Sequence, residues 1–310
     1  MKNILHFKYY GIFSLFIFSF WLGCEDNIEK NEQENGPKKL ISFGVSSFPF
    51  DNYEPLSHKP IEVHVYLPDS VKTDLPIMFV MHGASRNAQD YCFTWVAHAR
   101  EYQFITVCPD FSESMYPGSE QYNLGGMQLN GIWQDSTKWA YQYIEAIFQF
   151  LKNEKVSTVE SYGLYGHSAG SQFAHRLSLF TNPKHTSIII SANAGWYTTT
   201  DFDESFPYGL KDSPLTLERL KKKFELPLVI LLGEDDNDPN HSSLRKTEEA
   251  MRQGQHRFER GHYFFNTAQA MADSLGVEFN WILDTVPDVG HSNMGMAPKA
   301  AKIFFDKLKD

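Results

Sequence analysis

The sequence of 310 residues has little cysteine, fewer basic than acidic side chains and no apolar run long enough to fill a bilayer. Lysine and arginine number 28 against 38 aspartate and glutamate residues, which gives a net charge of −10. No basic stretch is dense enough to follow phosphates, so the charge argues against a nucleic-acid partner. The hydrophobic share of 42% and the charged share of 21% are those of a globular chain, neither mainly disordered nor polytopic in a membrane.

The first 24 residues combine a basic start, an apolar run and a cysteine. Residues 1–23 contain Lys2 and Lys8, no acid, and an apolar run over 11–23 that is shorter than the ~20 residues of a spanning helix. The run ends in Trp-Leu-Gly before Cys24, which is similar to the lipobox, where the cysteine is acylated and becomes the first mature residue. We expect removal of 1–23 and lipidation of Cys24; an ordinary signal peptide with an incidental cysteine is the alternative.

The next segment, 24–40, is expected to be an acidic, disordered tether. Ile28 is the single apolar side chain over 25–36, which is too little to offset the entropy of ordering the segment. We therefore expect an exported protein that is anchored by lipid at the outer membrane. Acids directly after the lipidated cysteine fit surface display, but a solvated linker on the periplasmic face looks the same.

Two further cysteines lie in the rest of the chain, Cys92 in an expected helix and Cys108 at an expected strand end. An exported chain permits a disulfide between them. The sequence does not give their separation, so a pair of small buried thiols stays the alternative.

From residue 61 onward, short apolar runs alternate with helical patterns, which predicts an α/β fold. Residues 61–67 alternate apolar and polar side chains, as in a half-exposed antiparallel strand near a sheet edge. Parallel strands covered on both faces are typically apolar throughout, and the runs of this kind are 77–81, 104–107, 162–165, 188–190 and 228–232. A last strand is expected over 277–286. Since no repeat or Pro- or Ser-rich linker follows residue 40, we expect one domain over 41–310, a mostly parallel sheet with helices on both faces.

Apolar side chains at helical spacing predict helices over 140–151, 173–180 and 264–275. Asp135 is a plausible N-cap of the first helix, and Gly276 ends the last. Two segments, 111–133 and 197–226, lack such periodicity and follow parallel strands, at the edge where open α/β sheets bind ligands. We expect them to form pocket walls. Their aromatic residues are either substrate contacts or core, and they are Trp133, Trp196, Tyr197, Tyr116 and Tyr122.

Residues 166–170 read Gly-His-Ser-Ala-Gly, the G-x-S-x-G pattern in which glycines let a strand turn sharply into a helix and expose the serine. The pattern alone is weak, but here it follows an apolar strand and opens an amphipathic helix, which is the context that the turn needs. Ser168 is therefore a candidate nucleophile.

A serine hydroxyl needs a base that takes its proton and a carboxylate that orients the base. After the run 228–232 come Asp235, Asp236 and Asp238, and after the final strand comes His291. The order serine, acid, histidine is that of α/β-hydrolases and differs from both protease orders.

These motifs together resemble the α/β-hydrolase superfamily, most closely its secreted esterases of the polyhydroxybutyrate-depolymerase and feruloyl-esterase kind, over about residues 60–305. Residues 81–88 are similar to the His-Gly-x-x-x-Asn-Ala turn after the third strand of those enzymes, and 233–236 to their Gly-x-x-Asp. The resemblance implies Asp236 as the acid, with Asp235 and Asp238 as rivals.

The expected activity is hydrolysis of a small-molecule or polymer carboxylic ester through an acyl-enzyme on Ser168. The backbone N–H groups of Ala84 and Ala169 are the candidate oxyanion hole. No metal or organic cofactor is expected: His241 and Thr247 break the calcium-loop pattern that begins at Asp236, and no histidine pair has zinc-ligand spacing.

Two other functions stay open. A serine peptidase of the same fold is one, although too few residues precede the first strand for a propeller or cap domain. A surface lipoprotein that binds glycan or polymer with a dead site is the other. Arg257 and Arg260, before an expected helix, are either a carboxylate-recognition pair or, as we expect, a surface ion-pair cluster.

Overall fold

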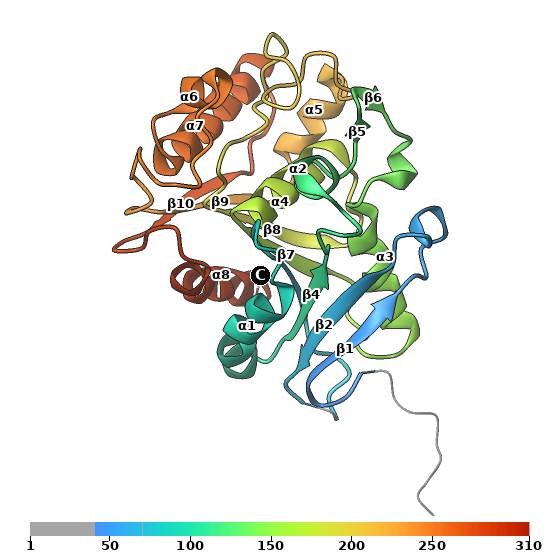
Figure 1. Ribbon diagram of the computed structural model, residues 1–310. Coiled ribbons are helices and arrows are strands. Elements are labelled where there is room, and N and C mark those ends of the chain that lie inside the picture. Colours follow the sequence, from blue (N-terminus) through green and yellow to red (C-terminus); the bar gives the residue numbers. More distant parts are fainter. Residues whose placement is uncertain (1–40, 70, 310) are drawn as a thin grey trace, which may run out of the picture. The chain divides into compact units, whose positions relative to one another are not determined.

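An eight-stranded sheet organises the chain, in the order β1-β2-β4-β3-β7-β8-β9-β10 (Figure 1). The computed structural model describes residues 41–69 and 71–309, so the expected signal peptide and tether lie outside the described residues. The strands are β1 Gly44–Phe50, β2 Ile61–Leu67, β3 Ile77–Met81, β4 Ile105–Asp110, β7 Tyr162–His167, β8 Thr186–Ala192, β9 Leu228–Gly233 and β10 Ile282–Val286. β1 pairs antiparallel with β2, and β2 antiparallel with β4, whereas all other pairs are parallel. The α/β class and the mostly parallel sheet are confirmed.

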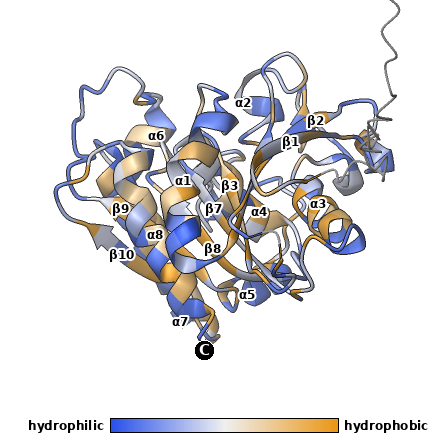
Figure 2. Ribbon diagram, turned by 90° about the horizontal axis from the view of Figure 1, so that it is seen from below, coloured by the Kyte–Doolittle hydropathy of each residue, from blue (hydrophilic) through white to orange (hydrophobic). Residues whose placement is uncertain are grey.

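Helices cover both faces of the sheet. Alternate side chains of each central strand point to opposite sides, so each of these apolar strands contributes to two cores. In β3, Ile77, Phe79 and Met81 belong to one core and Met78 and Val80 to the other. The second core is closed by α1 (Ala88–Tyr102) and α8 (Asn293–Lys307), which lie side by side in Figure 1. The first core is closed by α3 (Gln142–Asn153), α4 (Ala169–Phe180), α5 (Leu217–Phe224) and α7 (Arg257–Leu275). Figure 2 shows the expected colouring, with apolar strands inside and hydrophilic residues on the outer helix faces.

Short elements complete the described chain. They are η1 Glu54–Leu56, α2 Gly118–Gln121, the hairpin of β5 Gln128–Leu129 and β6 Ile132–Trp133, η2 Ser136–Lys138 and α6 Glu248–Gln253. Three of them, α2, β5 and β6, lie in the segment 111–133 after β4 for which the sequence shows no periodicity. No helix in the described ranges is long and apolar enough to cross a membrane.

Two local predictions are wrong. Asp135 caps the short helix η2, where its carboxylate accepts from the backbone N–H of Thr137, and α3 begins later without a side-chain cap. The last strand is also shorter than expected. Residues 277–281 do not join the ladder of β9. The backbone N–H of Asn280 donates instead to the carbonyl of Phe224 at the end of α5, and the indole of Trp281 donates to that of Lys223.

Cys92 and Cys108 are buried free thiols, so the disulfide alternative does not hold. They lie close enough for a hydrogen bond between the two side chains. Burial raises the pKa of the Cys108 thiol well above its ordinary value, which keeps it protonated and unreactive.

Candidate active site

Ser168 lies in a strained turn between β7 and α4, with φ 57° and ψ −114°. Non-glycine residues rarely adopt such a conformation, and it is held by close packing on both sides. A Cβ atom on Gly166 would lie 2.0 Å from the carbonyl oxygen of Gly170, and one on Gly170 would lie 2.2 Å from that of Met81. The two glycines of the G-x-S-x-G pattern are therefore required by backbone contacts, and they present Ser168 at the carboxyl edge of the sheet.

Ser168, His291 and Asp236 form one hydrogen-bonded chain. Nε2 of His291 lies 3.0 Å from Oγ of Ser168, and Nδ1 lies 2.7 Å from Oδ2 of Asp236. A carboxylate beside Nδ1 fixes the proton on that nitrogen, which leaves Nε2 free to accept the hydroxyl proton. This arrangement has the geometry of a nucleophile, a base and an orienting acid.

Asp236 is the acid that reaches His291, and its rivals point away. Its carboxylate is buried, at 4% exposure, whereas Asp235 and Asp238 are exposed. Asp238 instead accepts from the backbone N–H of Asn240.

The loops that carry Asp236 and His291 are held together by Asn193, which follows β8. Its side chain accepts from the backbone N–H of Gly233 and donates to the carbonyl of Gly290. A Cβ on Gly233 would lie 2.3 Å from the carbonyl oxygen of Val289, so the two loops are also in direct backbone contact. Asn193 has no local signature in the sequence, since its partners Gly233 and Gly290 lie far from it along the chain.

The turn after β3 lies beside the serine. The Cβ position of Gly83 is 3.9 Å from Cβ of Ser168, and Ala84 is the next residue in that turn. Ala169 is the first residue of α4, where a backbone N–H has no partner within the helix. Of the two residues named for the oxyanion hole, Ala169 therefore follows Ser168 directly in the chain, and Ala84 follows Gly83, which lies beside Ser168.

Two solved structures are similar to this chain over nearly their whole length. Poly(aspartic acid) hydrolase-1 from Sphingomonas sp. KT-1 is 41% identical, with a TM-score of 0.81 over 85% of this chain and 99% of that chain. LpqC, a poly(3-hydroxybutyrate) depolymerase from Bordetella parapertussis, is 31% identical, with a TM-score of 0.82 over 86% and 91%. The chain belongs to the α/β-hydrolase superfamily. An S-formylglutathione hydrolase from Agrobacterium tumefaciens, 15% identical with a TM-score of 0.57 over 87% and 96%, shares the fold.

No family model and no curated protein matches the sequence. The assignment to the α/β-hydrolases, in the group of esterases and depolymerases, therefore stands on the solved structures and agrees with the resemblance found in the motifs. The two structures that are 41% and 31% identical to this chain are hydrolases. This similarity identifies the chain as a hydrolase.

The carboxylate of Asp236 has a second partner, Arg257, which the sequence analysis assigned to a surface ion-pair cluster. Nη1 of Arg257 donates to Oδ1 of Asp236 at 3.1 Å, and both side chains are buried. Arg260 is buried as well and donates to the backbone carbonyls of Gly195, Arg245 and Gly254. The expected surface ion-pair cluster is therefore wrong, because the start of α7 packs these two arginines against the loops after β8 and β9.

His82 fixes the turn that contains Ala84. Its Nδ1–H donates to the carbonyl of Gly83, and its Nε2 accepts from the backbone N–H of Phe111. The ring of Tyr122 stacks on it at 4.5 Å between centroids. Burial lowers the pKa of His82 to about 4, so the imidazole is neutral and structural at neutral pH.

A second buried histidine, His167, links that turn to the serine. The hydroxyl of Tyr91 in α1 is hydrogen-bonded to Nδ1 of His167 at 3.0 Å and lies 2.8 Å from the Cβ position of Gly83. The ring of His167 lies 4.8 Å from that of His291, between centroids. Burial, and then the nearby charges of His291 and Arg257, hold the pKa of His167 well below its usual range.

The aromatic residues that the sequence left open as substrate contacts or core have different places. Tyr197, a candidate for the pocket, is fully buried and stacks on Phe264, so it is a core residue. Trp196 is 4% exposed and lies between Arg176 and Tyr208, so it is also core. Trp133 is half-buried, donates to the carbonyl of Asp212 and packs on Phe206.

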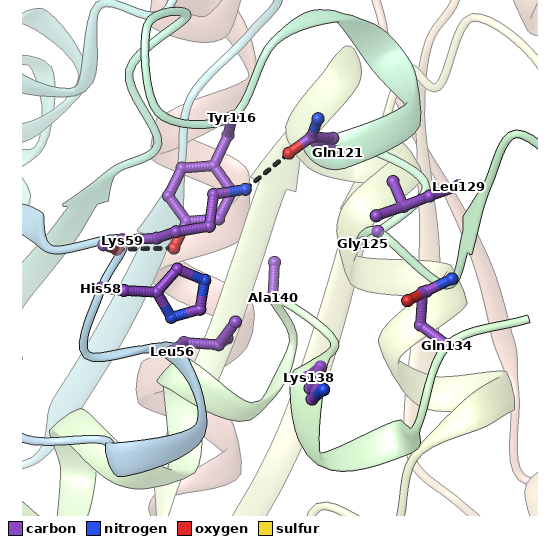
Figure 3. Close-up of a pocket in the computed structure, with 11 residues that line it drawn as sticks. Leu56, His58, Lys59, Tyr116, Gln121, Gly125, Leu129, Gln134, Lys138 and Ala140 are labelled. Atoms are coloured by element: carbon purple, nitrogen blue, oxygen red, sulfur yellow. Dashed lines mark hydrogen bonds between the residues drawn. The ribbon is translucent and has the colours of Figure 1, made fainter.

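Tyr116 does line a pocket, which Figure 3 shows. The pocket has a volume of about 210 Å³, and the described residues that line it include Lys59, Lys138 and His58 but no acid. Lys59 crosses the ring of Tyr116 and donates to Gln121 at 2.5 Å.

This pocket shares an edge with the candidate active site. Lys59 precedes β2, whose first residues pair with the carboxyl end of β4. β4 and β3 lie between β2 and β7 in the sheet, so at about 4.8 Å per strand β2 is roughly 14 Å from β7. It belongs to the same edge as Ser168, and no member of the hydrogen-bonded chain lines it.

Proposed function

We propose that this α/β-hydrolase cleaves carboxylic esters with Ser168 as nucleophile, His291 as base and Asp236 as the orienting acid. The observation that carries the proposal is the unbroken hydrogen-bonded chain from the hydroxyl of Ser168 through both nitrogens of His291 to a buried carboxylate. A non-glycine backbone held at φ 57° and ψ −114° is costly, and such strain is typical of a functional turn.

In the proposed reaction, His291 takes the proton of Ser168 while Oγ attacks the ester carbonyl. Asp236 stabilises the imidazolium that forms. The imidazolium then gives its proton to the leaving alkoxide oxygen, which departs as an alcohol and leaves an acyl-enzyme. Water, deprotonated by His291, attacks the acyl group, and the released Ser168 oxygen takes the proton back.

The oxyanion that forms on the carbonyl needs donors that are already in place. We assign this role to the backbone N–H groups of Ala84 and Ala169. The second lies at the N-terminus of α4, where the helix dipole also favours negative charge. Since His82 and Tyr122 make buried hydrogen bonds in the turn around Gly83 and Tyr91 packs against Gly83, the donor of Ala84 is supported by buried contacts.

The test is hydrolysis of a short-chain aryl ester by the mature protein. Activity in the wild type, its loss in Ser168→Ala and its retention in Ser114→Ala, an exposed serine, would support the proposal. A fluorophosphonate probe should modify Ser168 in the folded wild type. Absence of both hydrolysis and labelling would favour the alternative of a polymer-binding protein with a dead site.

Amide hydrolysis is the second candidate, and the similarity to poly(aspartic acid) hydrolase-1 favours it. A poly(aspartic acid) backbone is joined by amide bonds, and the same serine, base and acid can cleave them. Release of new amine ends from poly(aspartic acid), compared with release of acid from poly(3-hydroxybutyrate), would separate the two reactions in one protein.

We further propose that the protein is exported and lipid-anchored through Cys24, with its substrates outside the cytoplasm. The support is the sequence of the first 24 residues, which resembles a lipoprotein signal peptide. Cys24→Ser should release the protein from the membrane fraction, and unchanged partitioning would remove the anchor from the proposal.

A further inference from the structure

Arg257 makes the one charged contact to Asp236 besides His291 within the described residues. The two oxygens of the carboxylate are divided between the two partners. Oδ2 faces Nδ1 of His291 at 2.7 Å, and Oδ1 accepts from Nη1 of Arg257 at 3.1 Å. A carboxylate held at both oxygens cannot rotate without breaking one of these hydrogen bonds.

The guanidinium is itself held on its other side. Its Nη2 donates to Oγ of Ser243 at 2.9 Å and lies 3.5 Å from Nδ1 of His241, in the loop after β9. Arg257 is 2% exposed, so its own side chain is shielded from bulk water, while Ser243 lies at the surface. The planar fork of arginine suits two acceptors at fixed directions, which the single ammonium of lysine does not reproduce.

The backbone reinforces the same contact. The N–H of Phe258, the next residue in α7, donates to the carbonyl oxygen of Asp236 at 3.2 Å. The first turn of α7 thus contacts both the main chain and the carboxylate of Asp236, and the helix continues to Leu275 along the first core.

We propose that Arg257 is a positioning residue for the reaction. It fixes the carboxylate of Asp236 so that Oδ2 alone is presented to His291. The inference rests on the proposed function, because it concerns the acid of that same site. Arg257 does not reach the substrate in this role; it acts through Asp236.

Arg260 provides a matched control on the same helix. It is buried like Arg257 and joins three loops through backbone carbonyls, but it makes no hydrogen bond to Ser168, Asp236 or His291 in the described structure. Arg260→Gln therefore reports the general effect of removing a buried arginine from the start of α7.

The experiment measures kcat and KM on a short-chain aryl ester. Arg257→Gln should lower kcat about 10- to 100-fold with KM nearly unchanged, a part of the roughly 10⁴-fold loss that follows when a triad acid becomes an amide. Arg257→Lys should retain more activity than Arg257→Gln, and Arg260→Gln should keep kcat within about threefold of the wild type.

A double-mutant cycle with Asp236→Asn separates positioning from structural damage. If Arg257 acts through the carboxylate, Arg257→Gln should lower kcat no further once Asp236 is asparagine. Full multiplication of the two losses, or an equal loss in Arg260→Gln, would overturn the inference. If Arg257→Gln does not fold, Arg257→Lys takes its place in the cycle.

The measurements distinguish a failure of the proposed function from a failure of this inference. Equal activity in wild type and Ser168→Ala would refute the function. An active wild type with an unaffected Arg257→Gln would refute only the role of Arg257.

Discussion

The hydroxyl of Tyr91 is hydrogen-bonded to Nδ1 of His167 at 3.0 Å and thereby joins helix α1 to the residue that precedes the nucleophile. The same hydroxyl packs against Gly83, whose Cβ position lies 2.8 Å from it, so the turn proposed to hold one oxyanion donor and the turn that carries Ser168 contact a single phenol. Since Tyr91 and His167 are both buried, water does not replace either contact.

Tyr91→Phe should therefore lower both stability and activity. The loss of the hydroxyl leaves Nδ1 of His167 buried without its hydrogen-bond partner, which costs about 1–3 kcal/mol of unfolding free energy. We also expect kcat to fall about tenfold as the turn loosens, with KM less affected. Denaturant unfolding and ester kinetics measure the two effects. Tyr102→Phe, on the same helix with its ring stacked on Phe305, is the control and should change neither.

Acid should destabilise the fold through His82. Its pKa is lowered from 6.5 to about 4 in the folded state, so the unfolded chain binds the proton first as the pH falls. Stability should be lost from about pH 6.5 downward, by up to about 3 kcal/mol near pH 4 from this residue.

Urea unfolding between pH 7 and pH 4.5 measures this effect. His82→Gln should be less stable at pH 7 but should show a shallower decline with falling pH. Parallel curves for the two proteins would mean that His82 does not titrate in this way.

Gly166→Ala should abolish the fold of the nucleophile turn. The added Cβ would lie 2.0 Å from the carbonyl oxygen of Gly170, and neither backbone segment can move without displacing β7 or α4. We expect loss of activity and destabilisation of more than about 3 kcal/mol. Gly131→Ala is the control, because nothing lies within 4 Å of its Cβ position although its φ is 76°. It should cost about 1 kcal/mol and leave activity intact.

The two buried cysteines should resist alkylation in the folded protein. Cys108 has a raised pKa and both side chains are inaccessible, so iodoacetamide at pH 8 should modify them only after unfolding. Peptide mass spectrometry with and without urea measures this. A peptide pair joined by a disulfide in the untreated protein would contradict the assignment of free thiols.

The sequence predicted the centre of the sheet well, because a parallel strand covered on both faces must be apolar throughout. Residues 77–81 and 228–232 became β3 and β9 for this reason. Strand β1 was not foreseen, since its Val45, Ser46 and Ser47 give no continuous apolar face and its pairing with β2 is decided by tertiary contact. Helix α8 was also missed: it packs through small alanines, and Pro298 interrupts the pattern.

The residues of the candidate site also differ in whether the sequence alone could identify them. Ser168 and His291 stand in local motifs, so they could be named from their neighbours in the chain. The contact of Arg257 with Asp236 has no local signature, because it depends on how α7 returns against the loop after β9. Tyr197 is a different case. An aromatic residue after a strand is compatible with a pocket wall and with the core, and only its packing in the structure distinguishes the two.

The positions of Asp236 and His291 after two neighbouring strands have a consequence for inactivation by heat. Asp236 follows β9 and His291 follows β10, which is the edge strand and pairs with β9 alone in the described sheet. An edge strand opens at lower free energy than central strands such as β7. Warming should therefore detach the imidazole from the serine while the middle of the sheet is still intact, and hydrolysis should cease several degrees below the main unfolding transition.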